Sequence, residues 1–149
     1  MKNFVFKTLP IEEAEELMGS EIKYTPITMV LLGGDRIVCC DEAVVMRSES
    51  DDLIGIATIS SQGEDYSGDP EIVGLYILPE YRGQGYAKEL LKKTIERCTE
   101  RGFKKICLNV LSKKMMQVIN KLPAEMKEIL EVSDQSDNPL IDMLSESER

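Results

Sequence analysis

A glycine-rich turn between an apolar run and an amphipathic segment is the feature that most constrains this chain. The run from Ile72 to Leu78 is followed closely by Arg82-Gly83-Gln84-Gly85-Tyr86-Ala87. Glycines let a backbone approach an anion closely, and the N–H groups that begin a helix point at that anion with the positive end of the helix dipole behind them. Strand, glycine turn and helix start therefore predict a phosphate cradle, and a ligand with a diphosphate is the first hypothesis.

The length and composition fit one soluble domain over residues 1–149. Hydrophobic residues make up 42% of the chain and charged residues 30%, which suits an ordinary core. No apolar run reaches the length of a membrane span, and the first residues lack the apolar stretch of a signal peptide. We therefore expect a cytoplasmic protein with no membrane partner.

The charge and the cysteines exclude two classes of site. A net charge of −9 argues against a nucleic-acid surface and fits both plain solubility and a site that attracts a cationic amine. The cysteines show no zinc spacing and the chain has no histidine, so no metal is expected. Cys98 and Cys107 are predicted to pack as small hydrophobes. For the vicinal pair Cys39-Cys40 there are two interpretations: a redox role, or a position at a strand edge without a role.

The hydrophobic pattern predicts strands that alternate with helices. Strands are expected at Asn3 to Thr8, Glu42 to Ser48, Leu53 to Ser60, Ile72 to Leu78, Lys105 to Leu111, Met126 to Val132 and Leu140 to Leu144. Helices are expected from Pro10 to a stop at Gly19, from Ala87 to a cap at Gly102, and from Ser112 to Lys121.

The remaining segments are predicted as connections. Ser20 to Cys40 is interpreted as a variable loop with a short helix or strand, Ser61 to Pro70 as a loop, and Ser133 to Pro139 as a hairpin loop. The strand, helix and strand from Ile72 to Leu111 imply a parallel crossover. The expected fold class is α/β (α+β), with a mixed central β-sheet flanked by helices.

Three kinds of phosphate-binding site are alternatives for the glycine turn. A Walker loop needs a lysine and then serine or threonine after its second glycine, whereas this chain has Tyr86-Ala87 there. A dinucleotide-binding fold places the turn early in the chain within repeated units, whereas here it follows several strands and a hairpin. The third kind of site is suggested by a family resemblance.

The segment from Val73 to Leu91 resembles the acetyl-CoA-binding motif of the GNAT acyltransferase family. That motif reads Arg/Gln-x-x-Gly-x-Gly/Ala after a hydrophobic strand, and Arg82, Gly85 and Ala87 occupy its three fixed positions. The order of elements along nearly the whole chain is also similar to the family fold. The resemblance implies a single GNAT-like domain that transfers an acetyl group directly from acetyl-CoA to a primary amine.

Coenzyme A offers a pyrophosphate, a 3′-phosphate and a pantetheine arm with two amides. The turn's N–H groups suit the pyrophosphate, and the arm's amides can pair with an exposed strand edge. The resemblance implies that this edge is Leu75-Tyr76-Ile77, while Lys88 and Lys113 are candidates for the 3′-phosphate. The predicted cofactor-binding residues are therefore Leu75, Tyr76, Ile77, Arg82, Gly83, Gln84, Gly85, Tyr86, Ala87, Lys88 and Lys113.

Direct transfer needs a base for the amine and a donor for the developing oxyanion. Without histidine the base must be a carboxylate, and Glu71 is the first choice. It begins the central strand two and four residues before Val73 and Leu75, so it is expected to share their face. By family analogy, the oxyanion donor is a backbone N–H near Ile77. Weaker candidates for the base come from the preceding loop: Glu64, Asp65 and Tyr66.

The chain departs from the family pattern at the general acid. The tyrosine that the family often carries on the helix after the Ile106 strand is absent, and Asn120 falls near its place. An asparagine common at the start of that helix is also absent, with Lys113 nearby. Tyr24 or Tyr76 could substitute only if the fold brought them there.

Acidic residues gather in the two segments expected to receive the acceptor, namely Glu21, Asp35, Glu64, Asp65 and Asp69. They predict a cationic acceptor: a small amine, a polyamine or a peptide amine. The alternative is a non-catalytic GNAT-like module that binds acyl-CoA as a sensor or interaction partner, which the missing tyrosine and histidine would suit. A homodimer through the C-terminal strands is a further expectation from the resemblance.

Overall fold

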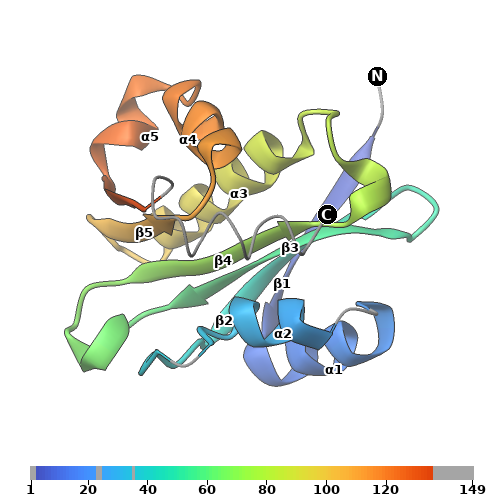
Figure 1. Cartoon of the computed structure of the whole chain (residues 1–149), viewed down its shortest axis with the longest axis horizontal. Helices are drawn as coiled ribbons and strands as arrows, with labels where there is room; N and C mark the ends of the chain where they lie inside the picture. The colour runs from blue at the N-terminus through green and yellow to red at the C-terminus, as the bar shows by residue number, and fades with distance from the viewer. Residues whose placement is uncertain (1–2, 23–24, 35, 136–149) are drawn as a thin grey trace.

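One mixed β-sheet forms the middle layer of the molecule. The computed structural model describes residues 3–22, 25–34 and 36–135. Its six strands lie in the order β1-β2-β3-β4-β5-β6 (Figure 1). They are β1 (Phe4–Pro10), β2 (Glu42–Ser48), β3 (Leu53–Ser60), β4 (Glu71–Ile77), β5 (Ile106–Val110) and β6 (Leu130–Asp134). Strands β1 to β4 are antiparallel neighbours, whereas β4, β5 and β6 run parallel, which confirms the predicted mixed sheet.

Helices cover both faces of this sheet (Figure 1). On one face lie α1 (Ile11–Glu21) and α2 (Thr25–Leu31), and on the other lie α3 (Tyr86–Glu100), α4 (Lys113–Asn120) and α5 (Ala124–Glu128). Two short 3₁₀ turns, η1 (Glu64–Tyr66) and η2 (Pro79–Tyr81), flank β4. Each face has its own buried cluster, with Leu90 and Ile95 of α3 in one and Met18 and Leu31 in the other.

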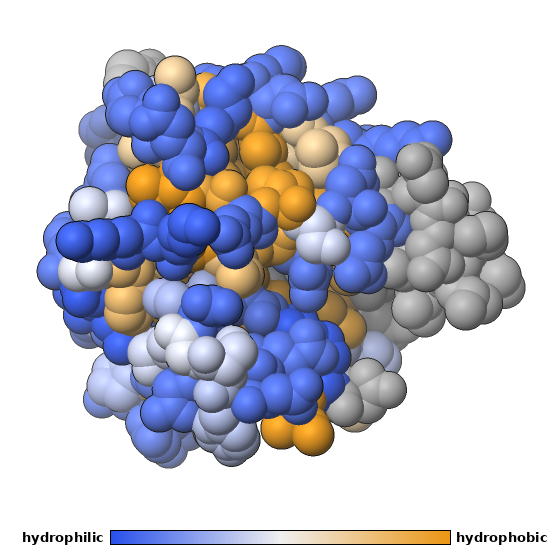
Figure 2. Space-filling model, turned by 90° about the vertical axis from the view of Figure 1, so that its left-hand side faces the viewer, coloured by the Kyte–Doolittle hydropathy of each residue, from blue (hydrophilic) through white to orange (hydrophobic). Residues whose placement is uncertain are grey.

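The surface carries apolar side chains among polar ones. Figure 2 shows a mostly hydrophilic face on which hydrophobic side chains gather in a band. Over the described part of the chain, the large exposed hydrophobics are Val5, Met29, Val30, Ile37, Tyr66, Leu111 and Val132.

Helix α3 follows the sequence prediction closely. Its apolar positions Leu90, Leu91, Ile95 and Cys98 are buried against the sheet, as the 3.6-residue period predicts. Gly102 adopts a φ of 87° and donates its N–H to the Thr99 carbonyl at 2.9 Å, which ends the helix as expected. The helix begins at Tyr86, one residue before the predicted start.

The predicted stop of the first helix at Gly19 was wrong. Helix α1 continues to Glu21, and the Ile22 amide still donates to the Met18 carbonyl at 3.0 Å. Ile22 is buried with Ile11, Ala14 and Met18, so it extends the same apolar face. Burial of this face outweighs the modest cost of one glycine within a helix.

The predicted strand from Met126 to Val132 was wrong in its first half. Pro123 presets the backbone for the helix α5, in which Met126 faces the core. Strand β6 starts only at Leu130 and extends to Asp134, so Ser133 is paired with Asn109 rather than lying in a loop. The strand expected from Leu140 to Leu144 lies outside the described residues.

A β-bulge interrupts β4 and sets the geometry around it. Thr58 of β3 pairs with Gly74 and Ile59 pairs with Ile72, so Val73 is an extra residue without a partner on β3. Bulges bend the strand that carries them. Beside the bulge, β4 pairs with β5 only through Glu71 with Cys107 and Ile72 with Leu108. Beyond these two pairs the parallel strands separate.

The close approach of β3 to β4 can be tested at Gly55. A Cβ there would lie 2.6 Å from Ile77 Cδ1 and 2.8 Å from the Tyr76 carbonyl oxygen, which is backbone and cannot move aside. We expect Gly55→Ala to lower the free energy of unfolding by about 1–3 kcal/mol. At Gly19, by contrast, a Cβ meets nothing within 4 Å, so Gly19→Ala should raise it by about 0.5–1 kcal/mol. Urea denaturation measures both changes, and a Gly55→Ala variant as stable as the parent would contradict the packing described.

Candidate functional site

The glycine turn begins α3 with an open row of amides. Gly83 and Gly85 have φ values of 77° and 84°, and a Cβ on either would meet nothing within 4 Å. The Glu89 amide donates to the Gly85 carbonyl at 3.4 Å, so the intrahelical bonds start there. The amides of Tyr86, Ala87 and Lys88 precede that bond and belong to the first turn, which has no intrahelical acceptors. The turn therefore presents several N–H groups and the helix dipole to one solvent-exposed place.

Arg82 connects this turn to the end of β4. Its Nε donates to the Ile77 carbonyl at 2.9 Å, and its guanidinium carbon lies 5.2 Å from the centroid of the Tyr76 ring. The side chain therefore folds back over the strand, while the backbone of Arg82 remains in the turn.

The backbone of β4 has one open edge, on the side of β5. The Leu78 amide donates to the Ile54 carbonyl of β3 at 2.9 Å. Because adjacent residues of a strand point their N–H and C=O groups to opposite sides, those of Ile77 point away from β3. The same alternation turns Leu75 outward and Tyr76 toward β3. Of the predicted edge residues, Leu75 and Ile77 therefore present their backbone N–H groups where β5 has separated.

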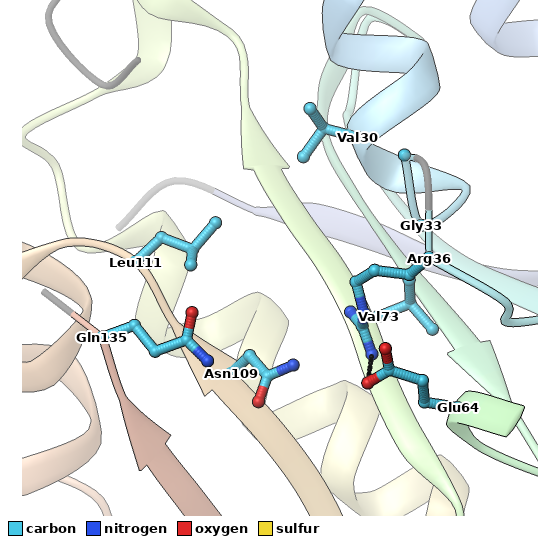
Figure 3. Close-up of a pocket in the computed structure, with 9 residues that line it drawn as sticks. Val30, Gly33, Arg36, Glu64, Val73, Asn109, Leu111 and Gln135 are labelled. Atoms are coloured by element: carbon cyan, nitrogen blue, oxygen red, sulfur yellow. Dashed lines mark hydrogen bonds and ion pairs between the residues drawn. The ribbon is translucent and has the colours of Figure 1, made fainter. Parts of the chain in front are cut away.

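A cavity of about 270 Å³ lies where β4 and β5 separate (Figure 3). The end of α2, the turn η1, the bulge of β4, strand β5 and the residue after β6 all contribute to its wall. Figure 3 shows Arg36 and Glu64 on one side and Asn109 and Gln135 on the other. The lining residues are Val30, Gly33, Gly34, Arg36, Glu64, Val73, Asn109, Leu111 and Gln135.

Two carboxylates share the guanidinium of Arg36 beside this cavity. Both oxygens of Glu71 accept from Arg36 Nη2, at 2.7 and 2.6 Å, and the Glu71 side chain is only 5% exposed. The same Nη2 lies 3.3 Å from Glu64 Oε2, whose side chain is 48% exposed. Burial opposes the charge on Arg36, but the bonds to Glu71 and Glu64 outweigh it and raise the pKa of the guanidinium. The group as a whole carries one net negative charge.

Glu71 lies on the same face of β4 as Val73, as predicted. The prediction that Leu75 shares this face was wrong. Val73 Cγ1 lies 3.8 Å from where a Cβ on Gly33 would be, near the end of α2, and Arg36 follows on the same side. Leu75 instead packs into the α3 cluster. The bulge at Val73 shifts the alternation of the strand, and no pattern in the sequence indicates it. Arg36 was also missed, because it lies 35 residues from Glu71 in a segment interpreted as a variable loop.

The other predicted acidic residues do not all reach the cavity. Glu21 bonds Arg47 at 2.6 Å, which lowers the pKa of Glu21, and Arg47 pairs with Leu53 at the end of β3 opposite to the one near Glu71. Asp65 and Asp69 are exposed in the loop that contains η1. Asp35 and Tyr24 lie outside the described residues. Glu64 is therefore the one residue of that described set beside Arg36.

The remaining sequence candidates are distributed around the two helices after β4. Lys88 lies on the first turn of α3, and Lys113 is the exposed first residue of α4. The Ser112 hydroxyl caps α4 by accepting from the Met115 amide at 3.1 Å. Asn120 is the exposed last residue of that helix, and its backbone carbonyl lies 3.4 Å from Lys127 Nζ.

The vicinal cysteines have different surroundings. Cys39 is exposed, whereas Cys40 packs against the α1–α2 cluster and burial raises the pKa of its thiol to about 11. Cys98 is buried, which raises the pKa of its thiol to about 12. Within residues 3–22, 25–34 and 36–135, no group of acidic, cysteine or histidine side chains is arranged to hold a metal ion.

Comparison with known proteins identifies the family. Residues 14–118 match the model of the Acetyltransferase (GNAT) family, and the chain belongs to this family. No match to the sequence is found among curated proteins. The described part of the chain contains no helix both long and apolar enough to cross a membrane.

Solved structures share the fold at low sequence identity. The GNAT family N-acetyltransferase YhbS from Escherichia coli, solved in complex with CoA, has a TM-score of 0.55 and 14% identity over 90% of each chain. The aminoglycoside N-acetyltransferase AAC(6')-Iy, also solved with CoA, has a TM-score of 0.53 and 17% identity over 81% of this chain and 86% of that one. The spermidine/spermine N-acetyltransferase SpeG from Vibrio cholerae has a TM-score of 0.53 and 16% identity over 80% and 78%.

The environments of the cysteines predict an order of reactivity. A thiol reacts as its thiolate, so burial and a raised pKa both slow its alkylation. With iodoacetamide at pH 8, we expect Cys39 to be modified first and Cys40 and Cys98 to remain largely unmodified until urea unfolds the chain. Peptide mass spectrometry over time measures this order, and modification of Cys40 at the rate of Cys39 would contradict its placement against the core.

Proposed function

We propose that this protein is an acetyl-CoA-dependent N-acetyltransferase that transfers the acetyl group directly to a primary, cationic amine. One observation carries the proposal. The open amides at the start of α3 lie beyond the end of β4, the open edge of β4 comes next, and the cavity lies beside the bulge of the same strand. Membership of the GNAT family supports an acetyl donor. The CoA complexes of YhbS and AAC(6')-Iy support coenzyme A as the carrier.

In the proposed complex, the pyrophosphate binds the N–H groups of the turn from Gly83 to Ala87. The pantetheine amides then pair with Leu75 and Ile77, as an added strand would. Ile77 and Val73 are four residues apart, or about 13 Å along an extended strand, so the arm leads the thioester toward the cavity. Lys88 and Lys113 are the proposed partners of the 3′-phosphate.

The proposed transfer forms one bond and breaks one. The amine nitrogen attacks the thioester carbon, and the C–S bond breaks with its electron pair on sulfur. A thiol has a pKa of about 8.5, so the thiolate leaves readily and a general acid helps without being essential. A backbone N–H of β4 beside the cavity stabilises the oxyanion, which places the proposed donor nearer to Val73 than Ile77, the residue that the sequence suggests. The base is a carboxylate at Arg36, for which the sequence suggests Glu71.

The charge around the cavity supports a cationic acceptor. Arg36, Glu64 and Glu71 together leave one negative charge there, and the whole chain carries −9. Two of the solved structures with this fold are an aminoglycoside N-acetyltransferase and a spermidine/spermine N-acetyltransferase, which supports an amine acceptor. A cytoplasmic location remains a prediction.

A second candidate is a non-catalytic module that binds acyl-CoA. Helix α4 carries no tyrosine, and Glu71 is already held by Arg36. These two features favour a binding role over catalysis. Only turnover distinguishes the two candidates, because both bind the same ligand.

The cradle can be tested with two glycines that have the same backbone geometry. Gly85 and Gly102 have φ values of 84° and 87°, and an added Cβ meets nothing within 4 Å at either. Each alanine substitution should lower the free energy of unfolding by about 1–2 kcal/mol, because a left-handed backbone is unfavourable for a residue with a Cβ. Only Gly85→Ala should weaken acetyl-CoA binding, by about tenfold or more, because its Cβ occupies the proposed pyrophosphate site. Calorimetry with CoA, ATP and NAD measures this, and equal affinities in both variants would contradict the cradle.

The activity itself is tested by acetyl-CoA turnover over a panel of amines. We expect turnover with diamines, polyamines or peptide amines, and much less with neutral or anionic acceptors. Turnover restricted to neutral or anionic acceptors would contradict the cationic acceptor. A chain that binds acetyl-CoA and acetylates no amine would support the binding module instead.

A further inference from the structure

Only one of the two carboxylates on Arg36 lines the cavity. Glu64 is among the lining residues and its side chain is 48% exposed. Glu71 is not among them, and its side chain is 5% exposed. In Figure 3, Glu64 points to Arg36 from the turn η1 at the cavity wall. A substrate amine in this cavity would meet Glu64 first.

We infer that Glu64 is the general base of the proposed acetyl transfer and that Arg36 and Glu71 are positioning residues. The inference rests on the proposed function and changes the role of Glu71 in it. A general base must come within hydrogen-bond reach of the proton that it takes, directly or through one water. The exposure of Glu64 to the cavity satisfies that requirement.

The contacts of Glu71 make it a poor acceptor of a substrate proton. Its two oxygens lie 2.7 and 2.6 Å from Arg36 Nη2, within a partly buried ion pair. Protonating Glu71 would remove the two shortest contacts of the guanidinium, and breaking such a pair is costly. Glu64 makes a longer contact of 3.3 Å with the same nitrogen and can exchange its proton with solvent.

The loop that carries Glu64 is built tightly enough to position a catalytic group. An added Cβ on Gly63 would collide with the Asp69 carbonyl oxygen, and the Gly68 amide donates to the Gln62 carbonyl at 2.8 Å. The Asp65 amide donates to the Ile37 carbonyl at 2.7 Å, which holds η1 against the segment that carries Arg36.

The same loop holds strained backbone. Asp65 and Tyr66 have φ values of 56° and 54°, in the left-handed region that costs non-glycine residues energy. Such strain is concentrated at functional sites, where the surrounding structure maintains it. The two strained residues directly follow Glu64, so the strain lies where the proposed base needs to be fixed.

The proton transfer accompanies the step already described. A proton passes from the acceptor ammonium to a Glu64 oxygen, and the freed lone pair attacks the thioester carbon. The C–S bond breaks, sulfur keeps the electron pair, and Glu64 releases the proton to solvent. Arg36, itself fixed by Glu71, holds the Glu64 carboxylate at the cavity wall. The nitrogen gives up a second proton to solvent as the amide forms. The products are the acetylated amine, the CoA thiolate and two protons.

The inference is tested by comparing Glu64→Gln with Glu71→Gln, using Glu128→Gln on the exposed face of α5 as the matched control. We expect Glu64→Gln to lower kcat by about 10²-fold or more while acetyl-CoA affinity stays unchanged. The defect should shrink as acceptors of lower amine pKa are used, because these are already neutral at the assay pH. Glu128→Gln should match the parent.

Glu71→Gln should behave differently. It should lower the melting temperature, reduce kcat by less than Glu64→Gln does, and show a defect that is independent of the acceptor's pKa.

Three results would overturn the inference. If Glu71→Gln remains folded, binds acetyl-CoA and loses as much kcat as Glu64→Gln or more, Glu71 is the base. If Glu64→Gln is as active as the control in an active parent, Glu64 has no such role. A parent that binds acetyl-CoA but acetylates no amine would overturn the proposed function, and this assignment with it.

Discussion

The separation of β4 from β5 is the constraint on which the rest of the molecule depends. Strand β4 is paired with β3 along most of its length but with β5 at only two positions. An unpaired strand edge exposes backbone donors and acceptors that need partners. Here that edge points to where β5 has separated, and the cavity lies beside its start at Val73. The bulge at Val73 bends β4 at this point.

The scaffold around that opening is well packed, and the proposed functional groups lie at its margins. Every residue of β3 is buried, and α3 covers the neighbouring strands with a continuous apolar face. Arg36 and Glu64 instead come from a segment after α2 and a turn after β3. Loops positioned by a rigid scaffold are where binding and catalytic residues are concentrated. The ion pairs of Arg36 join these two segments to the start of β4.

The sequence alone allowed the central part of the fold to be predicted. The run before the glycine turn, the period of α3 and the capping Gly102 each depend on local spacing, so β4, the turn and α3 were predicted within a residue or two. The bulge at Val73 could not be predicted, because it depends on how β3 and β4 pair across the sheet. Arg36 was missed for the same reason, since only tertiary structure brings it to Glu71. Helix α5 was missed because Met126 and Ile129 fit a short strand as well as a helical turn.

Under the proposed function, the charges at the cavity would restrict which acceptors approach the thioester. Two carboxylates share one guanidinium, and the more buried of them takes its shortest contacts. Arg36 Nε is buried and has no partner within the described residues, so it cannot reach an anionic group in the cavity. The negatively charged group on the cavity wall is therefore the half-exposed Glu64. It lies opposite the amides of Asn109 and Gln135. An ammonium group that approaches Glu64 would gain a partner, whereas a carboxylate would meet a like charge there. Under the proposed function, the carboxylate that takes the proton would thus also select for the kind of acceptor that carries it.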